Sequence, residues 1–518
     1  MRRTDELREQ IELLVRPGSV DLMPGEGCGQ VTGRIAKDVV NGLEQLREVI
    51  HRVLAGREPD ALPLLVSANQ EGGRLNALDW AGTVQLPGNL ALGATDDATL
   101  AKAAGAVIGG QLRAVGLTWN LAPVCDLASW PSTSAVGTRS FGTDPARVAE
   151  LAGAFVHGLQ GAGVAATAKH FPGLGSVAAD PHHTAPVVDE LPVGALLPFR
   201  ASVDAGVACV MAGSHTVRSL DDRPAFASQR VIELLRDELG FDGVVVSENL
   251  SLPAVHGRFG GVAEAAVEAV AAGVDIVMFD SEISRGGGTN ATTTVPDRRA
   301  VVVDALTAAV ETRRIDRERI EEAAARVHRL HQRYGVRSGI GLPPWAAANS
   351  AAGDVASRVA EWSVAVVRGR HLLPISVAPG RTVGLVRVPN VGERRADSAR
   401  NAPDLMPAAL GQRVPVRPVE LGAALPADCA LAIVHSYDSR SADQRLSAAV
   451  REAARLTGRG LTVVQIAFGD PDDLAGSPAD VLVAAFAPHR EGVTATVDIL
   501  LGSGQLRPAR FPVEGSPW

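Results

Sequence analysis

Short apolar runs that alternate with segments of helical periodicity constrain this chain more than any other feature of its sequence. Runs that are apolar on both faces are typical of parallel strands, because helices cover both sides of such a sheet. The runs lie at residues 62–69, 117–126, 164–171, 208–212, 243–248 and 275–279. The sequence therefore predicts an α/β fold with a parallel sheet in this part of the chain.

Polar residues close several of these runs. Asn69, Asp126, His170, Glu248 and Asp280 come at or directly after the ends of runs. In a (β/α)8 barrel the carboxyl edge of the strands holds the chemistry, and an open doubly wound sheet places its ligand at the same edge. Six strands are visible in the sequence rather than eight. We predict a (β/α)8 TIM-type barrel, and the open sheet is the alternative.

A break in the pattern separates a second, smaller α/β region. A helical segment at 316–334 is followed by a cluster of glycine and proline at 335–344, which is typical of a boundary. After a connecting helix near 356–368, further apolar runs lie at 382–388, 429–435, 461–468 and 481–486. We predict a catalytic barrel domain at 1–340, a linker with a connecting helix at 341–375, and an α/β sandwich domain at 376–518.

Charge and length limit the classes of partner. A chain of 518 residues favours two domains over one. Its net charge is −8 and it has no run of Lys or Arg, so we expect no nucleic acid and no membrane among its partners. Residues 1–8 are highly charged, unlike an export signal, and we expect a cytoplasmic protein, either a monomer or a homodimer.

Metal and cofactor patterns are absent from the sequence. Cys28, Cys125, Cys209 and Cys429 are scattered without metal-binding or redox spacing. There is no H-E-x-x-H zinc pattern, no phosphate-binding loop ending in G-K-S/T and no G-x-S-x-G nucleophile turn. We expect neither a metal nor an organic cofactor.

The segment 168–184 carries the most informative chemistry. A strand ends at Lys169 and His170, and the Gly/Pro loop that follows places Asp180 two residues before His182. In an extended or turn conformation, residues i and i+2 can face the same way, so Asp180 can accept a hydrogen bond from the ring of His182. Such a carboxylate makes a histidine a better acid or base near neutral pH. The alternative is a surface loop in which the two residues meet by chance.

Glu248 is the other candidate catalytic group. It ends the apolar run at 243–248, and a carboxylate at that edge, paired with an acid/base on another loop, can attack an anomeric carbon. The alternative is a solvated residue at the end of a strand. Two polar turns add candidate binding residues, Asn69 before Q-E-G-G-R and Arg139 within G-T-R-S-F-G.

These segments together resemble family 3 of the glycoside hydrolases, in its bacterial β-N-acetylglucosaminidase branch. The K-H-F-P-G-x-G loop at 169–175 followed by D-x-H is specific for that branch, and Q-E-G-G-R, G-T-R-S-F-G and F-D-G-V-V-V-S support it. The resemblance implies a retaining mechanism through a covalent glycosyl-enzyme, without a cofactor. By resemblance, Glu248 is the nucleophile, His182 the acid/base and Asp180 its partner, while Arg139, Lys169 and His170 match sugar-binding positions.

Three residues depart from the pattern of the branch. Glu248 stands where the branch has Asp, Asn69 replaces the Asp that precedes Q-E-G-G-R, and Leu174 replaces a second His of the loop. A shift of about 1 Å can cost on the order of a hundredfold in rate. A neutral amide also forms weaker hydrogen bonds than a carboxylate. We interpret the changes as altered specificity.

The leading hypothesis is a retaining hydrolase of terminal β-N-acetylglucosamine-type sugars, acting on a small carbohydrate or glycoconjugate. One alternative is a phosphorylase or transglycosidase acting on a modified amino sugar, because a neutral histidine does not repel phosphate as a carboxylate does. The other alternative is a catalytically silent sugar-binding protein, which the residues Glu248 and Asn69 motivate.

Overall fold

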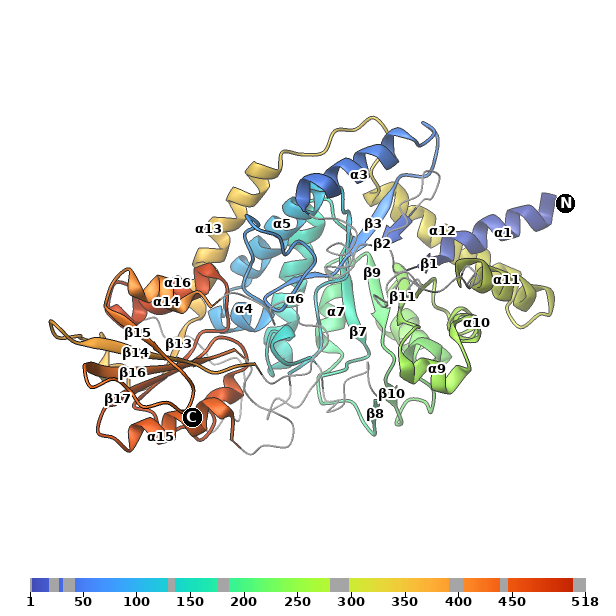
Figure 1. The fold of residues 1–518 in the computed structure, drawn as a ribbon. Coiled ribbons are helices and arrows are strands. Elements are labelled where there is room, and N and C mark those ends of the chain that lie inside the picture. Colours follow the sequence, from blue (N-terminus) through green and yellow to red (C-terminus); the bar gives the residue numbers. More distant parts are fainter. Residues whose placement is uncertain are drawn as a thin grey trace, which may run out of the picture.

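The computed structural model of the chain describes residues 2–17, 28–30, 42–128, 136–175, 186–279, 298–390, 404–437 and 446–505. Figure 1 shows that these residues form two bodies, each built on its own strands, with the later part of the chain at the left of the view. None of the helices in the described ranges is both long and apolar enough to cross a membrane.

The first body is a parallel α/β structure with a barrel-like arrangement. In the described residues its strands pair as a five-stranded sheet in the order β1-β12-β11-β9-β7 and a three-stranded sheet in the order β2-β3-β6. These strands are β1 (Val15–Pro17), β2 (Cys28–Gln30), β3 (Leu65–Ala68), β6 (Trp119–Asn120), β7 (Thr167–Phe171), β9 (Cys209–Ala212), β11 (Val244–Asn249) and β12 (Ile276–Phe279). Parallel bridges from Trp119 to Ala165 and from Val124 to Lys169 connect the two sheets. Closure into a (β/α)8 barrel stays a prediction.

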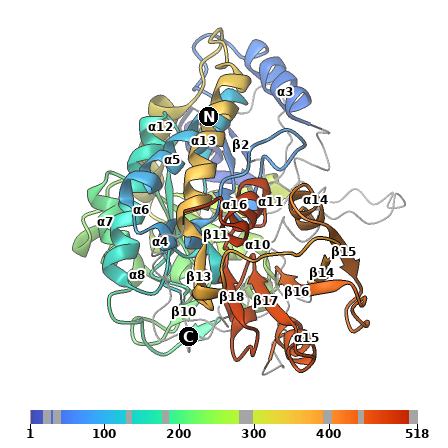
Figure 2. The same ribbon diagram turned by 90° about the vertical axis from the view of Figure 1, so that its left-hand side faces the viewer.

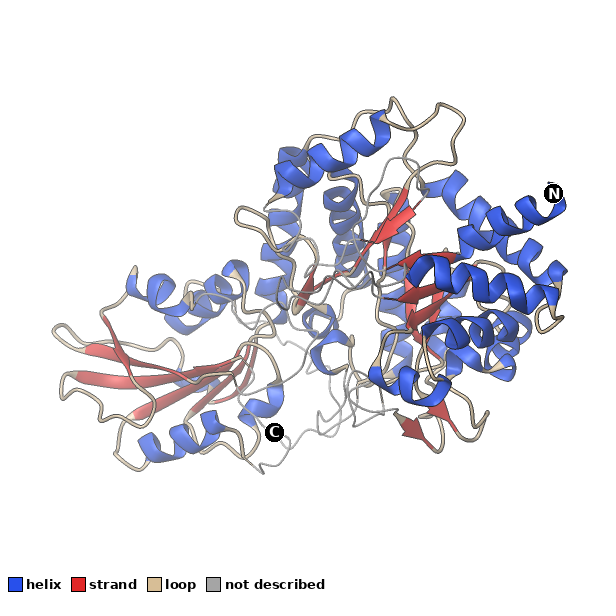
Figure 3. Cartoon of the chain, turned by 45° about the vertical axis from the view of Figure 1, so that its right-hand side comes forward, coloured by secondary structure: helices blue, strands red, loops and turns tan. Residues whose placement is uncertain are grey.

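Helices surround these strands, as Figure 3 shows. They are α1 (Arg2–Leu14), α3 (Leu43–Ala55), α4 (Asn89–Thr95), α5 (Ala98–Ala114), α6 (Pro145–Gly161), α7 (Leu197–Asp204), α8 (Gln229–Glu233), α9 (Pro253–Phe259), α10 (Val262–Ala272), α11 (Arg298–Glu311) and α12 (Arg317–Tyr334). Asp97 and Asp144 begin α5 and α6 by accepting hydrogen bonds from backbone N–H groups of the first turn. Because helices cover them, β3, β7, β9 and β12 are buried at every position.

Four short strands form two further pairs in the first body. β4 (Gln70–Gly72) and β5 (Leu75–Asn76) make an antiparallel hairpin directly after β3. β8 (Val187–Val188) and β10 (Thr216–Val217) pair in parallel, and they follow β7 and β9 in the chain. Both pairs therefore come after the carboxyl ends of strands of the main sheets.

The second body is a layered α/β sheet in the order β13-β18-β17-β16-β14-β15. Its elements are α13 (Trp345–Ser363), β13 (Ala365–Arg368), β14 (Thr382–Arg387), α14 (Met406–Gly411), β15 (Val416–Val419), β16 (Cys429–Ser436), α15 (Ala448–Thr457), β17 (Thr462–Ala467), β18 (Val481–Ala484) and α16 (Arg490–Leu501). β13 is antiparallel to β18, and the other pairings are parallel. Figures 1 and 2 show α15 on one face and α14 and α16 on the other.

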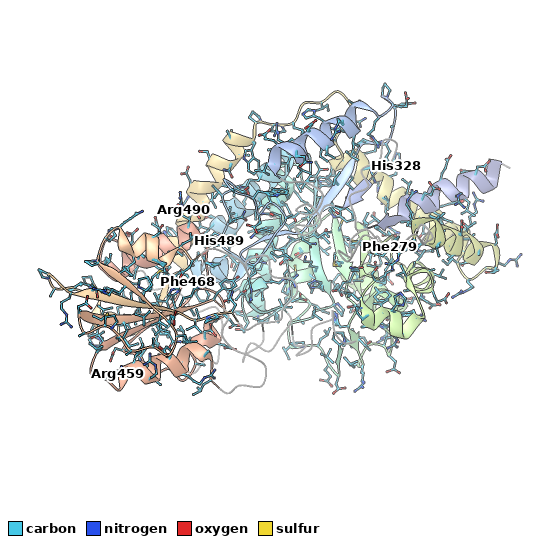
Figure 4. All side chains as sticks on the ribbon, viewed as in Figure 1. Phe279, His328, Arg459, Phe468, His489 and Arg490 are labelled. Atoms are coloured by element: carbon cyan, nitrogen blue, oxygen red, sulfur yellow. The ribbon has the colours of Figure 1, made fainter. Side chains whose placement is uncertain are left out.

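The two bodies touch at the turn that follows β4. The ring Nε2 of His489 lies 2.9 Å from the carbonyl oxygen of Gly73. The guanidinium of Arg74 lies over the ring of Tyr437, 5.1 Å from its centroid. Figure 4 shows Phe468 and His489 on the side of the second body that faces the first, and Arg459 on its far side. The carboxyl ends of the second sheet therefore face the first body.

Several expected elements are confirmed and others differ. Each of the six runs of the first region contains a strand, although β11 continues one residue past its run to Asn249, and α12 coincides with the expected helix at 316–334. β1 and β2 have three residues each, too few for a recognisable period. The helix expected near 356–368 was wrong at its end, because α13 stops at Ser363 and β13 follows. The sequence also missed β15, a partly exposed edge strand that contains Pro418. The domain boundaries remain predictions.

Candidate active site

A buried cluster of charges lies after the carboxyl end of β3. Glu71, which is 2% exposed, accepts two hydrogen bonds of 2.8 Å from the guanidinium of Arg139. The ammonium of Lys169 lies 2.6 Å from the same carboxylate and donates a hydrogen bond of 3.0 Å to the Oδ1 atom of Asn69. The structure thus brings together Asn69, Arg139 and Lys169 around Glu71, which the sequence did not single out.

Electrostatics hold this cluster in its charged form. Burial alone would raise the pKa of the Glu71 carboxyl, but the charges of Arg139 and Lys169 outweigh burial and lower that pKa to about 2. Burial lowers the pKa of Lys169, whereas Glu71 and the more weakly acting Glu248 raise it. Arg139 and Lys169 share one buried carboxylate, and the charge of Glu248 acts on both of them as well.

The backbone of the turn explains its glycines. Gly72 and Gly73 have φ angles of 84° and 60°, which favour glycine. A Cβ atom on Gly73 would lie 2.7 Å from the Cα atom of Gly88, so a side chain does not fit there. The side chain of Asn120, at the end of β6, exchanges two hydrogen bonds with the backbone of Gln70. The Q-E-G-G-R segment therefore holds Glu71 in a fixed position.

A second pair joins Asp126, in the segment that follows β6, to His170 near the end of β7. The Nδ1 atom of His170 lies 2.8 Å from the Oδ2 atom of Asp126, and the backbone N–H of Leu174 donates to Oδ1 at 2.6 Å. Burial raises the pKa of Asp126, but His170 and these hydrogen bonds outweigh burial and lower it. An ionised Asp126 can only accept, so Nδ1 of His170 donates and a neutral ring keeps its lone pair on Nε2.

Glu248 lies at the end of β11 and is 9% exposed. Its Oε2 atom accepts a hydrogen bond of 2.7 Å from the backbone N–H of Ser214 and one of 2.6 Å from the Ser214 hydroxyl. The negative charge of Glu248 acts to raise the pKa of both Arg139 and Lys169. Glu248 therefore belongs to the same electrostatic site as the Glu71 cluster, and Ser214 fixes one of its oxygens.

His215, next to Ser214, is a further buried group of this site. Its ring is fully buried, and burial lowers its pKa to about 4, although the charges of Asp126 and Glu248 act in the opposite direction. The ring is therefore neutral near pH 7. A Cβ atom at Gly213 would lie within 2.6 Å of this ring, so the glycine leaves room for the histidine.

The predicted site residues fall into two groups. Asn69, Arg139, Lys169, His170 and Glu248 lie at one edge of the first body, as described above, whereas Asp180 and His182 lie outside the described residues. Sequence reasoning did not assign Glu71, Ser214 and His215 to the site. Glu71 lies inside the Q-E-G-G-R motif, which was recognised in the sequence. What was not predicted is that Arg139 and Lys169 share a buried carboxylate partner. Ser214 and His215 follow a short strand without a recognisable motif.

Comparisons with known proteins show similarity to one enzyme family. The profile of the glycosyl hydrolase family 3 N-terminal domain matches residues 27–330. A β-hexosaminidase of Nitrosomonas eutropha is 32% identical over 302 residues, which cover 56% of this chain and 81% of that protein. A β-hexosaminidase of Pseudomonas aeruginosa is 40% identical over 239 residues, covering 45% of this chain and 69% of that protein.

A solved structure extends the likeness to both bodies. The family 3 β-N-acetylglucosaminidase of a Paenibacillus species superposes with a TM-score of 0.82 at 28% identity, covering 98% of this chain and 99% of that one. Its coverage supports an α/β TIM-barrel-like domain followed by a second domain. The resemblance seen in the sequence is thereby confirmed, and the chain belongs to glycoside hydrolase family 3, on the branch of the bacterial β-N-acetylglucosaminidases.

Proposed function

We propose that this chain is a retaining β-N-acetylglucosaminidase that acts on a small carbohydrate or glycoconjugate. The observation that carries the proposal is the position of Glu248, a buried carboxylate held by Ser214 in the same site as Arg139 and Lys169. The names of the relatives, at 32% and 40% identity, supply the class of sugar. The fold proposed with this function is a closed (β/α)8 barrel.

In the first step, Glu248 attacks the anomeric carbon of the bound sugar and the bond to the leaving oxygen breaks. His182 donates its proton to that oxygen, with Asp180 holding the ring. A water molecule then transfers a proton to His182 and attacks the same carbon, which releases Glu248. Ser214 donates both of its hydrogen bonds to Oε2, so we assign the attack to Oε1. The roles of His182 and Asp180 rest on the family resemblance.

The charged cluster is proposed to bind the sugar rather than to react with it. Lys169 and Arg139 share the carboxylate of Glu71, and charge-assisted hydrogen bonds hold both cations in place before the sugar arrives. His170 presents Nε2 because Asp126 takes Nδ1. By resemblance to the branch, Asn69 offers an amide where a carboxylate is usual, so we expect weaker binding of the hydroxyl that this position contacts.

The test is release of nitrophenol from the aryl β-N-acetylglucosaminide and the matching β-glucoside. We expect wild type to prefer the first substrate, and Glu248→Gln to lose about a thousandfold or more of its kcat. Glu233→Gln, which changes an exposed glutamate of α8, is the matched control and should keep full activity. A fluorinated glycoside with a good leaving group, whose covalent intermediate is hydrolysed slowly, should add the mass of one fluorinated sugar to the peptide that contains Glu248.

Each alternative has its own outcome. If sugar 1-phosphate forms only when phosphate is present, the chain is a phosphorylase rather than a hydrolase. Saturable sugar binding by a folded wild type without turnover of either substrate would identify a binding protein. Activity of Glu248→Gln within tenfold of wild type would remove Glu248 from the nucleophile position.

A further inference from the structure

A pocket lies at the carboxyl edge of the second sheet, where no function is yet assigned. It lies between the ends of β14 and β16 and is partly open to solvent. Arg387 and Asn390 contribute from the end of β14, and His435 and Tyr437 from the end of β16.

Strand order places this pocket where α/β sheets bind ligands. β14 pairs with β15 on one side and with β16 on the other. The chain runs from β14 outward to β15 and then returns to the opposite side of β14 to form β16. The connection that leaves the carboxyl end of β14 leads to β15, whereas the one that leaves β16 leads to β17 on the opposite side. The two connections therefore diverge, and a crevice opens outside the carboxyl ends at such a reversal.

His435 is a buried polar side chain that is aimed into this pocket. It is 4% exposed, and its Nε2 atom has no hydrogen-bond partner in the part of the chain that the structure describes. The nearest carboxylate oxygen, Oδ2 of Asp404, is 3.7 Å away, which is beyond hydrogen-bond distance. A buried polar atom without a partner is unfavourable, so its retention calls for an explanation.

Burial sets the protonation of this histidine. It lowers the pKa of His435 to about 4, against the charge of Asp404, while Arg387 acts in the same direction as burial. The ring is therefore neutral near pH 7 and interacts with a ligand through hydrogen bonds rather than through charge. Its edge-on contact with Phe468, with ring centroids 6.2 Å apart, fixes its orientation.

The charges around the pocket define the ligand. The cationic side chain of Arg387 lines one part of it, and Pro488 and Val493 place the first turn of α16 at another. The first turn of a helix carries partial positive charge and favours an anion. Asp404 lies beside His435, and a ligand hydroxyl about 2.8 Å from both side chains would donate to the carboxylate and bond to the ring.

We propose that this pocket binds a small hydroxylated molecule that carries one anionic group, a carboxylate or a phosphate. The anionic group lies near Arg387 and the start of α16, and a hydroxyl connects His435 with Asp404. The site is separate from the residues assigned to hydrolysis, so the proposal does not depend on the sugar chemistry of the first body. Tyr437 lines the pocket and contacts Arg74, which places the ligand beside the turn that carries Glu71.

The experiment is calorimetric titration of the full chain with glucuronate, glucose 6-phosphate and glucose as probes. We expect saturable binding of at least one anionic probe, and binding of glucose at least tenfold weaker. Arg387→Met removes an exposed cation and should weaken binding of the anionic probe at least tenfold. His435→Leu should weaken its binding by a similar factor. Comparison of the two anionic probes distinguishes a carboxylate ligand from a phosphate ligand.

Arg459→Met is the matched control, because Arg459 is an exposed arginine at the opposite end of the second body from Phe468 (Figure 4). It should change the dissociation constant less than twofold. The proposal is overturned if neither anionic probe binds, if glucose binds as tightly as they do, or if both pocket variants bind them like wild type. The last outcome would assign the binding to another place, such as the sugar site.

Discussion

Buried polar side chains gather at the carboxyl ends of strands in both bodies, and the two groups differ in how they are paired. Glu71 in the first body is 2% exposed and is bonded to Arg139 and Lys169. His435 in the second body is 4% exposed, and its Nε2 atom has no hydrogen-bond partner among the described residues. The same position in a sheet therefore holds a pre-organised charge cluster in one body and an unsatisfied group in the other.

This difference in pairing predicts how substitutions at each sheet edge should change the stability of the protein. Paired charges are expensive to disrupt, because removing one partner leaves the others buried without compensation. An unsatisfied polar atom has the opposite property, because an apolar replacement removes a cost. Substitutions in the two groups should therefore change stability in different directions.

The largest effect is expected for Glu71→Gln. The substitution leaves Arg139 and Lys169 buried without their shared anion, and we expect a loss of about 3–5 kcal/mol in the free energy of unfolding at pH 7. Urea unfolding followed by circular dichroism measures it, with Glu233→Gln as the control. A loss below about 1 kcal/mol would contradict a pre-organised cluster.

The stability difference between wild type and Glu71→Gln should depend on pH. The pKa of Glu71 falls from 4.5 to about 2 on folding, so the stability it provides is present above pH 4.5 and is lost as the pH falls toward 2. The difference between wild type and Glu71→Gln should therefore shrink across that window. A constant difference down to pH 2 would show that the ion pairs are not its source.

A smaller effect is expected for Ser214→Ala, which removes the hydroxyl that donates to Glu248 and leaves the backbone N–H of residue 214 in place. We expect kcat to fall about tenfold to a hundredfold with little change in KM, because the oxygen of the nucleophile is held less firmly. Steady-state kinetics on the aryl substrate measures both constants. Ser214→Thr keeps a hydroxyl and should recover part of the loss in kcat. A rise in KM of Ser214→Ala as large as the fall in kcat would instead indicate a role in substrate binding.

The smallest effect at pH 7 is expected for His435→Leu, which replaces the unsatisfied ring by an apolar side chain. The free energy of unfolding should change by less than about 1 kcal/mol, or should rise. Burial lowers the pKa of His435 from 6.5 to about 4, so the unfolded chain takes up a proton first and wild type loses stability as the pH falls from 6.5 to 4. The variant should lose less over that window, and thermal melts at several pH values measure the difference.

The sequence predicted much of the fold and part of the site. The runs that became β3, β7, β9, β11 and β12 were visible because they are apolar on both faces. β1 and β2 were not visible, because three residues carry no period. Motifs identified Arg139 and Lys169, but not that both bond to Glu71, because hydrogen-bond partners so far apart in the sequence have no local signal. The catalytic assignments of Glu248, His182 and Asp180 remain proposals.

The sequence by itself determined most of the longer parallel strands, several polar residues near their ends and the family of the chain, because these depend on local periodicity and on short motifs. Tertiary structure decided which charges share a carboxylate and where the second pocket opens. The pocket depends on β16 pairing beside β14 on the side opposite β15. Strand order is set by packing of the whole sheet, so the approach of His435 to Asp404 and Arg387 follows from the fold and not from any segment alone.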